Sequence, residues 1–263
     1  MYHWQPRFEF QHPPGSYEQT LAHPVENDKE VNIGISHEHR FAFYFWGRWI
    51  AAYDTVSAGN RPHLVSIDWH RDLALPTEQE QDDLESLDIS NSNEMSLFCW
   101  GYLNPHNDDH VLAAAYKNMI GDVYVLCKQK FANPSEIIDH LGNKHTVNVY
   151  REKEALLENL PDDKPVILDL DLDYFTETDS FMGMDADVEL SSDQQIYSLL
   201  DPDSDFLGKI YQNLFGFTIA LEPKFCGGYQ NSCSLFKKVD QQLFNPPLLH
   251  PAGDWKKTDN EKR

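Results

Sequence analysis

Short runs of apolar and β-branched residues recur along the chain and constrain its fold more than any other feature. A run that is apolar at successive positions is typical of a strand buried on both faces of a parallel sheet. The segments between these runs carry apolar residues at helical spacing, which is the alternation expected of βαβ units. The expected strands are Val31–Ile35, Leu64–Ile67, Val123–Cys127, Val147–Tyr150, Val166–Leu170 and Phe217–Leu221. The expected helices are Phe41–Tyr53, His110–Met119, Ser135–Leu141, Arg151–Leu160 and Phe206–Phe215. The sequence therefore predicts an α/β protein with three αβα layers around a central parallel sheet.

The chain length fits this fold. A chain of 263 residues suits one large α/β domain, which buries roughly three quarters of its unfolded surface. Residues 1–30 are rich in Pro, His, Gln and Glu, and predict an irregular N-terminal arm. Residues 245–263 begin with Asn-Pro-Pro and end in a charged stretch, and predict a peripheral C-terminal tail. We expect a single domain with both ends at its periphery.

Charge and hydropathy exclude several classes of partner. The chain has 21 Lys and Arg against 43 Asp and Glu, a formal net charge of −22. Such a surface repels phosphate backbones, so nucleic acid is not expected as a partner and a cationic ligand is favoured. No stretch approaches the roughly 18 uncharged apolar residues of a membrane span, and Met1–Gln5 lacks the basic-then-apolar build of a signal peptide. We expect a cytoplasmic protein with no membrane partner.

Two of the expected strands end in carboxylates. The strand Leu64–Ile67 runs into Asp68, His70 and Asp72, an Asp-x-His-x-Asp pattern. Side chains at alternate positions of a strand share one face, and ligands of α/β sheets bind at the carboxyl ends of strands. The strand Val166–Leu170 overlaps a second run of acids, which comprises Asp169, Asp171 and Asp173. Three like charges so close together are unfavourable unless a cation lies among them, so this pattern favours a metal over a solvated edge strand.

A third strand end adds an imidazole. His39 follows the strand Val31–Ile35 and directly precedes the helix expected from Phe41. The candidate ligands together are four carboxylates and two imidazoles, namely His39, Asp68, His70, Asp72, Asp171 and Asp173. Their charge balances two divalent cations, and oxygen-rich ligation without thiolate favours Mn²⁺, with Fe²⁺, Co²⁺ or Zn²⁺ also compatible. Two such ions lower the pKa of a water and stabilise a tetrahedral intermediate, so hydrolysis is the expected chemistry.

These motifs resemble those of the ureohydrolase superfamily of arginase, agmatinase and their relatives. That family builds a dinuclear manganese site from a His before a helix, an Asp-x-His-x-Asp and a later Asp-x-Asp, and Glu38-His39, Asp68-x-His70-x-Asp72 and Asp171-x-Asp173 occur here in the same order. The resemblance covers roughly residues 31–225 and implies an arginase-like fold with two Mn²⁺ per chain. It places Asp169 behind the metal ligands, although a shift of the motif by one step would exchange Asp169 with Asp173.

The resemblance also implies substrate-binding and catalytic residues. Glu222 follows the strand Phe217–Leu221, as does the family's guanidinium-binding glutamate, and a carboxylate pairs with a guanidinium through two hydrogen bonds. An ordinary acid at a strand end is the alternative interpretation of Glu222. For the histidine that transfers a proton in arginases, His106 and His110 are both candidates, and a surface histidine is the alternative for each.

The closest resemblance within the superfamily is to the arginase-like group that carries Leu-Asp-x-Asp-Leu-Asp-Tyr-Phe, found here at Leu168–Phe175. Some members are peptide arginases, which convert arginine side chains of a ribosomally made precursor peptide to ornithine and urea. Asp72 is followed by Leu73–Pro76 rather than by the polar loop that holds the free amino and carboxylate groups of arginine. We therefore expect an arginine-containing precursor peptide as substrate and a homo-oligomer as a possible assembly. The alternatives are a ureohydrolase acting on free arginine or agmatine, an amide hydrolase of the deacetylase type, and a metal-stabilised peptide-binding module without turnover.

Overall fold

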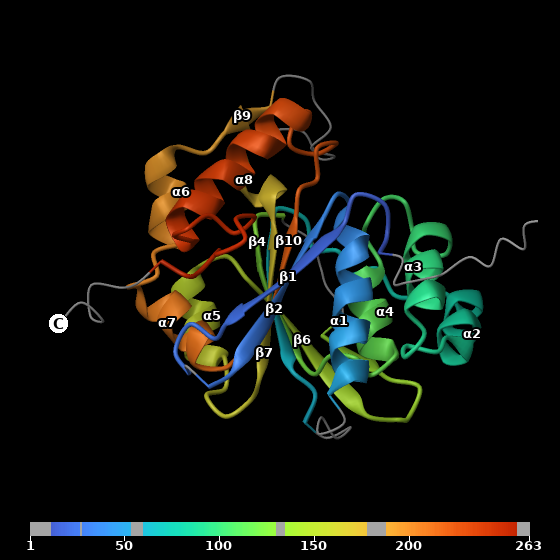
Figure 1. Cartoon of the computed structure of the whole chain (residues 1–263). Coiled ribbons are helices and arrows are strands. Elements are labelled where there is room, and N and C mark those ends of the chain that lie inside the picture. Colours follow the sequence, from blue (N-terminus) through green and yellow to red (C-terminus); the bar gives the residue numbers. More distant parts are fainter. Residues whose placement is uncertain (1–11, 27, 54–59, 130–134, 178–187, 257–263) are drawn as a thin grey trace, which may run out of the picture.

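The computed structural model describes the whole chain except residues 1–11, 27, 54–59, 130–134, 178–187 and 257–263. Its main strands are β1 (Tyr17–Ala22), β2 (Glu30–Ser36), β3 (His63–Asp68), β4 (Val123–Cys127), β5 (Glu136–Ile138), β6 (Lys144–Tyr150), β7 (Val166–Asp171) and β10 (Leu214–Ala220). They form one 8-stranded sheet in the order β1-β2-β10-β7-β3-β4-β6-β5 (Figure 1). The six central strands, which are β2, β10, β7, β3, β4 and β6 in that order, run parallel to one another. The edge strands β1 and β5 pair antiparallel with β2 and β6. A separate short pair consists of β8 (Thr176–Glu177) and β9 (Glu189–Leu190).

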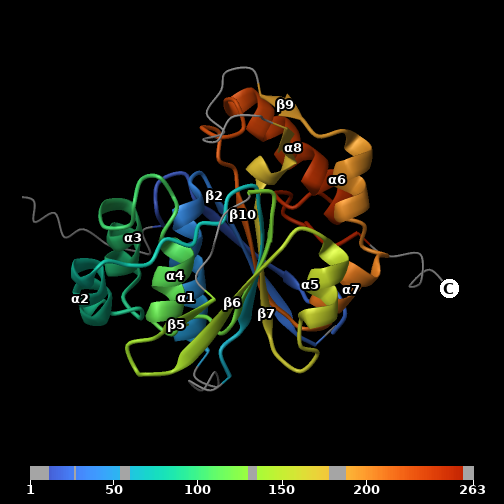
Figure 2. The same ribbon diagram turned by 180° about the vertical axis from the view of Figure 1, so that it is seen from behind.

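Helices flank the sheet on both sides (Figures 1 and 2). One side carries α1 (Ala42–Ala52), α2 (Glu78–Ser86), α3 (Ser92–Gly101) and α4 (His110–Tyr116). The other side carries α5 (Lys153–Asn159), α6 (Asp193–Leu199), α7 (Asp205–Gln212) and α8 (Tyr229–Leu243). Each side has its own cluster of buried apolar side chains. The predicted α/β class with a mostly parallel central sheet is confirmed, and the flanking helices are compatible with a three-layer αβα fold.

The alternation of side chains along the strands directs polar groups to one side of the sheet. In β7, Leu168 and Leu170 belong to the core under α5 to α8, whereas Ile167 belongs to the core under α1 to α4. Because alternate residues of a strand face opposite sides, Asp169 and Asp171 lie on the same side as Ile167. The carboxylates at the end of this strand therefore face the side that α1 covers.

Helix α1 packs unusually close to the sheet because the strands beneath it carry glycine. A Cβ atom on Gly34 of β2 would lie 2.6 Å from ring atoms of Phe45, and one on Gly216 of β10 would collide with the ring of Trp49. A larger residue at either position would push the helix away. The close approach holds the start of α1, and with it the preceding short 3-10 helix η1 (His39–Phe41), over the carboxyl ends of β2 and β10.

Two predictions of local structure are wrong. The expected helix Ser135–Leu141 contains instead the edge strand β5, which pairs with β6 from Glu136 to Ile138. Its apolar residues are too few to bury a helical face, whereas the edge of β6 offers backbone partners. The expected helix Phe206–Phe215 ends at Gln212, because Leu214 already belongs to β10.

The chain ends are also more ordered than the sequence predicts. The expected irregular arm 1–30 includes β1, which pairs with β2 over its whole length, while residues 1–11 of the arm lie outside the described part. The expected peripheral tail 245–263 packs on the core as far as Lys256. Leu248 is fully buried, and the indole of Trp255 contacts Tyr211 and Phe244. The tail packs on the core because it contains apolar residues before its charged end, among them Leu248 and Trp255.

Candidate metal centre

The site lies where the direction of the chain through the sheet reverses. From β3 the chain adds β4 and then β6 on one side, and it later returns to add β7 and β10 on the other side of β3. Such a reversal leaves a crevice outside the carboxyl ends of the two strands concerned. Ile67 pairs with Leu170 in the ladder between β3 and β7. The next residues, Asp68 and Asp171, therefore end neighbouring strands at the mouth of this crevice.

His39 lies at the centre of the cluster and is completely buried. Its Nδ1 atom is 2.9 Å from Asp72 Oδ2, 3.1 Å from Asp171 Oδ2 and 3.6 Å from Asp68 Oδ2. Its Nε2 atom is bound on the opposite side, 2.7 Å from Asp169 Oδ2. The imidazole thus turns one nitrogen towards three carboxylates and is fixed through the other.

Asp169 is held by the strands on either side of it. In the parallel ladders it pairs with Ser66 of β3 and with Thr218 of β10. The Ser66 hydroxyl donates to Asp169 Oδ2 at 3.0 Å, and the Thr218 hydroxyl donates to Oδ1 at 2.6 Å. Asp169 thus lies on the opposite side of the His39 ring from Asp72 and Asp171. A carboxylate that orients a ligating histidine in this way sets both the ring position and the tautomer.

Asp173 reaches the cluster from a 3-10 turn rather than from a strand. β7 ends at Asp171, and η3 (Leu172–Phe175) begins with the Asp173 N–H donating to Asp171 Oδ1 at 3.0 Å. Asp173 Oδ2 lies 2.7 Å from His70 Nδ1, and Asp173 Oδ1 accepts from the Trp69 N–H at 3.2 Å. Asp68 Oδ1 accepts from the His70 N–H at 2.7 Å. His70 and Asp173 therefore form the outer side of the cluster, next to Asp68.

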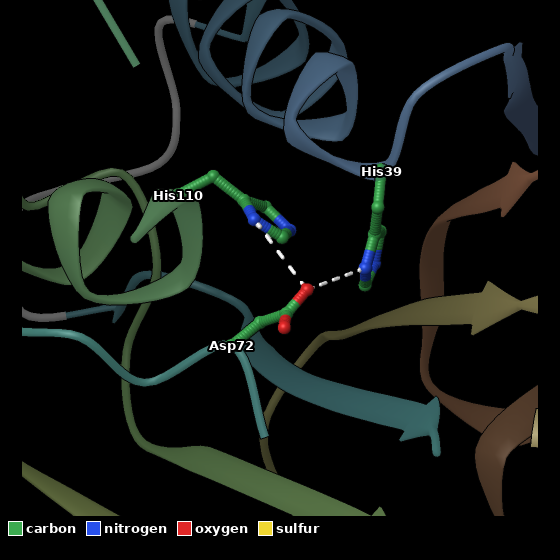
Figure 3. Close-up of side chains that lie close together, drawn as sticks. All are labelled: His39, Asp72 and His110. Atoms are coloured by element: carbon green, nitrogen blue, oxygen red, sulfur yellow. Dashed lines mark hydrogen bonds and ion pairs between the residues drawn. The ribbon is translucent and has the colours of Figure 1, made fainter. Parts of the chain in front are cut away.

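Asp72 lies on the other side, between His39 and His110 (Figure 3). Its backbone has φ +49°, a left-handed conformation that turns the chain back over the end of β3. Asp72 Oδ2 is 2.9 Å from His39 Nδ1 and 4.0 Å from His110 Nδ1. His110 is the first residue of α4 and is completely buried, with its ring centroid 4.3 Å from that of His39.

The electrostatics of the cluster show a shortage of positive charge. Burial, followed by the charges of Asp72 and Asp173, raises the pKa of Asp68 well above its ordinary value. Burial and Asp173 raise the pKa of Asp171 to about 7. Burial opposes the charged form of His39, but Asp169 and Asp171 outweigh it and raise the pKa of His39 well above the usual range. Asp173 differs, because the charge and hydrogen bond of His70 outweigh burial and lower its pKa. Additional positive charge would therefore stabilise the ionised forms of Asp68 and Asp171.

Three overlapping groups of side chains in the described part of the chain have the geometry of a metal site: His39-Asp72-His110, His39-Asp68-Asp171 and Asp68-His70-Asp173. Within each group, the candidate ligand atoms lie within 4.8 Å of one another. Asp68 Oδ2 is buried and has no hydrogen-bond partner among the described residues. An oxygen-rich set with imidazole and without thiolate suits a hard or borderline divalent cation. The cluster can therefore hold metal ions, and it contains every metal ligand expected from the sequence.

The two candidate proton-transfer histidines differ in position. His110 is buried against His39 and Asp72, where burial, followed by the charge of His39, lowers its pKa well below the usual value. His106 is exposed and lines a cavity of about 370 Å³, which also borders His70, Asp72, Asp171, Asp173 and Glu222. The sequence offered His110 as a proton carrier, whereas the structure places it among the possible ligands. The sequence signal that could have identified His110 as a possible ligand is its position at the start of a helix, which His39 also occupies.

Glu222 lies at the wall of the same cavity, 2% exposed, with a left-handed φ of +39°. Its Oε1 atom accepts from the His39 N–H and, at 2.5 Å, from Asn107 Nδ2. Burial and the charge of Asp171 raise the pKa of Glu222 well above its ordinary value. The structure thus brings this expected guanidinium-binding residue to the metal cluster. Sequence reasoning missed Asn107 and Arg71, which also line the cavity, because Asn107 lies in a loop and Arg71 occupies a variable position of the Asp-x-His-x-Asp motif.

Comparison with known proteins adds no relative. No family model and no curated protein matches the sequence. In the part of the chain that the structure describes, no helix is both long enough and apolar enough to cross a membrane. The functional argument therefore depends on the site itself.

Proposed function

We propose that this protein is a metal-dependent hydrolase of the arginase type, which converts arginine side chains of a precursor peptide to ornithine and releases urea. The observation that carries the proposal is one cavity of about 370 Å³ bordered by the acidic cluster and by the buried carboxylate of Glu222. The first offers ligands for divalent cations, and the second offers an acceptor for a guanidinium. Their position side by side is what hydrolysis of a guanidinium group requires.

Six side chains would hold two Mn²⁺ ions: His39, Asp68, His70, Asp72, Asp171 and Asp173. When bound, such ions would supply a nucleophilic water at neutral pH. Asp169 would keep the His39 ring in place, since its Oδ2 atom lies 2.7 Å from His39 Nε2. Asp68 and Asp171, at neighbouring strand ends, would be among the side chains that hold the ions.

Glu222 and His106 would act on the substrate. Glu222 accepts hydrogen bonds from the guanidinium and holds its carbon at the metal cluster. Hydrolysis breaks the bond between this carbon and the side-chain nitrogen that becomes the amine of ornithine, and that nitrogen needs a proton. His106 lines the cavity at an exposed position, where it can exchange protons with solvent and deliver one to the leaving nitrogen.

The wall of the cavity favours an arginine within a peptide. Leu73 and Ala74 border the cavity directly after Asp72, and neither side chain can bind a free amino or carboxylate group. A peptide-borne arginine has no such groups at its α carbon. The net charge of −22 would also attract a basic peptide.

One observation favours the second candidate, a ureohydrolase that acts on a small guanidine with a carboxylate, such as free arginine. Arg71 lines the same cavity, and its Nε atom donates to Gln129 Oε1 at 3.1 Å. A guanidinium at a cavity wall is suited to binding a carboxylate. Agmatine lacks a carboxylate, so Arg71 would not strengthen its binding.

Urea release from the Mn²⁺-loaded protein tests both candidates. The substrates are an arginine-containing peptide with blocked termini, free arginine and agmatine, assayed in parallel. Urea from the peptide alone supports the peptide hydrolase, and urea from free arginine alone transfers the protein to the second candidate. Release of no urea from any of the three by protein with two bound Mn²⁺ would contradict the hydrolase proposal.

The proton-transfer role has its own test. His106→Asn should lower kcat for urea release about 10²-fold or more while KM and metal content stay unchanged, since only the proton carrier is lost. His140→Asn is the matched control, because His140 lies in the β5–β6 hairpin with its Nδ1 2.9 Å from the Tyr116 carbonyl oxygen. An unchanged kcat in His106→Asn would exclude His106 as the proton carrier.

A further inference from the structure

Asn107 occupies a rigid position beside Glu222. It closes a turn in which its N–H donates to the Asn104 carbonyl oxygen at 2.9 Å, while Asn104 Oδ1 accepts from the His106 N–H at 2.9 Å. Its backbone is left-handed, with φ +61°, a conformation that asparagine tolerates better than most residues. The turn presents the Asn107 side chain to the cavity wall.

The contact with Glu222 fixes the orientation of the Asn107 amide. Glu222 Oε1 accepts one hydrogen bond from Asn107 Nδ2 and another from the His39 N–H, so this oxygen acts as an acceptor and is paired with the amide nitrogen. The amide nitrogen must therefore face Glu222, and the amide oxygen must point away from it. That oxygen, Asn107 Oδ1, is buried and has no hydrogen-bond partner among the described residues, although the residue is only 4% exposed.

A buried acceptor without a donor is unfavourable, and it is unusual in a side chain that is otherwise so well held. Asn107 and Glu222 both line the cavity at the metal cluster. Together they offer a carboxylate and an amide oxygen that are joined by one hydrogen bond, so their relative position is fixed. A ligand that completes this pair must bring hydrogen-bond donors in more than one direction and carry positive charge.

We infer that Asn107 Oδ1 is a second acceptor for the substrate guanidinium, which it holds together with Glu222. A guanidinium is planar and carries donors on all three nitrogens, so it can serve both acceptors at once. A lysine ammonium is a compact charge on a flexible chain and gains less from a fixed pair of acceptors. Asn107 thus contributes to the choice of arginine over lysine, an inference that rests on the proposed function of the site.

The test is the affinity of the Mn²⁺-loaded protein for two blocked peptides that differ only in arginine or lysine. Titration calorimetry is carried out in the His106→Asn background, so that the arginine peptide is consumed slowly. Asn107→Gly removes the amide and suits the left-handed backbone. We expect it to weaken binding of the arginine peptide about 10-fold to 100-fold, the range for a hydrogen bond to a charged group. Binding of the lysine peptide should change much less.

Asn118→Gly is the matched control. Asn118 is also buried, has φ +54° and carries an amide without a hydrogen-bond partner in the described part of the chain, but it lies after the C-terminal end of α4, away from the cavity. It should leave both affinities unchanged, and thermal unfolding and metal content should show that both variants are folded and loaded. The inference would be overturned if Asn107→Gly lost equal affinity for the two peptides, or if it lost no affinity for the arginine peptide. If the arginine peptide binds but yields no urea, the hydrolase proposal fails while the affinity ratio still decides the role of Asn107; if it does not bind, both fail.

Discussion

Two groups of buried carboxylates among the described residues have opposite surroundings. In the hairpin between β5 and β6, Asp139 is 4% exposed and is surrounded by donors. Its Oδ1 accepts from the N–H groups of Leu141 at 2.9 Å and Asn143 at 2.7 Å, and its Oδ2 accepts from Asn143 Nδ2 at 2.9 Å and approaches His145 Nε2 at 3.2 Å. At the metal cluster, four buried carboxylates share two imidazoles and a few backbone N–H groups.

The difference appears in the pKa values. Burial alone would raise the pKa of Asp139, but the hydrogen bonds from Asn143, His145 and Leu141 outweigh it and lower the pKa. At Asp171, burial and the neighbouring charge of Asp173 act together and raise the pKa to about 7. Asp171 is the more deeply buried of the two and has fewer donors, and both differences raise its pKa relative to that of Asp139. Hydrogen-bond donors surround Asp139, which shapes a turn. The cluster that could hold a metal ion has few such donors, and a bound cation could neutralise its carboxylates instead.

The largest effect is expected from the same substitution made in both places. Asp171→Asn should lower urea release on the order of 10³-fold and reduce bound Mn²⁺, because the cluster loses a ligand at its centre. Asp139→Asn should leave both unchanged, because the hairpin lies outside the cavity. Urea assays and metal analysis on the two purified variants make the comparison. If Asp171→Asn kept metal and turnover, the dinuclear site would be wrong; if it kept peptide affinity but lost turnover, a pure binding module would be excluded.

Metal should stabilise the protein through the cluster. At about 100 times its Kd, each bound Mn²⁺ should raise the free energy of unfolding by about 2.7 kcal/mol in the native chain, since it binds only the folded state. The gain should be the same in Asp139→Asn and close to zero in Asp171→Asn. Denaturant unfolding with Mn²⁺ and with a chelator measures it. An equal gain in all three proteins would place the binding site elsewhere.

Substitution of Asp169 should have an intermediate effect on metal affinity, because Asp169 does not face the other carboxylates but binds the far nitrogen of the His39 ring. Both carboxylate oxygens of Asp169 bind neighbours, namely His39 Nε2, Ser66 and Thr218. Asp169→Asn replaces one of these acceptor oxygens with a donor nitrogen. Affinity for Mn²⁺ should fall about 10-fold to 100-fold, the usual loss for a group that orients a metal ligand. Ser66→Ala removes one hydrogen bond to the same carboxylate and should have a smaller effect. Calorimetric titration with Mn²⁺ ranks the two variants, and the reverse order would contradict the positioning role.

The smallest effect should be on the stability of the hairpin. Asp139→Asn should lower the free energy of unfolding by about 1–3 kcal/mol at pH 7, because one face of the group becomes a donor facing donors. The folded pKa of Asp139 lies below its unfolded value. Its stabilisation is therefore complete above the unfolded pKa of about 3.9 and is lost as the pH falls through the folded pKa. Denaturant unfolding of both proteins at pH 7 and pH 3 should show the difference shrinking, and a constant difference would exclude the charge as its cause.

Much of the fold could be predicted from local patterns. Continuous apolar runs identified Val123–Cys127 with the bounds that the structure gives, and they located the other central strands to within a few residues. The helix expected over Ser135–Leu141 failed because three apolar residues among polar ones fit a helix or an edge strand equally well. Pairing with Lys144–Thr146, across the hairpin, decided between them.

The sequence by itself determined which side chains are available at the site. Strand period and direction place Asp68 and Asp171 at the carboxyl ends of buried strands, and this follows from backbone geometry alone. Only the tertiary structure decided which of them meet. The insertion of β7 beside β3 brings Asp68 to Asp171, although they are far apart in the chain, and the approach of α4 adds His110. The pairing of Asn107 with Glu222 depends likewise on loops from distant segments, and no local pattern encodes such a contact, because it is set by how complete elements pack.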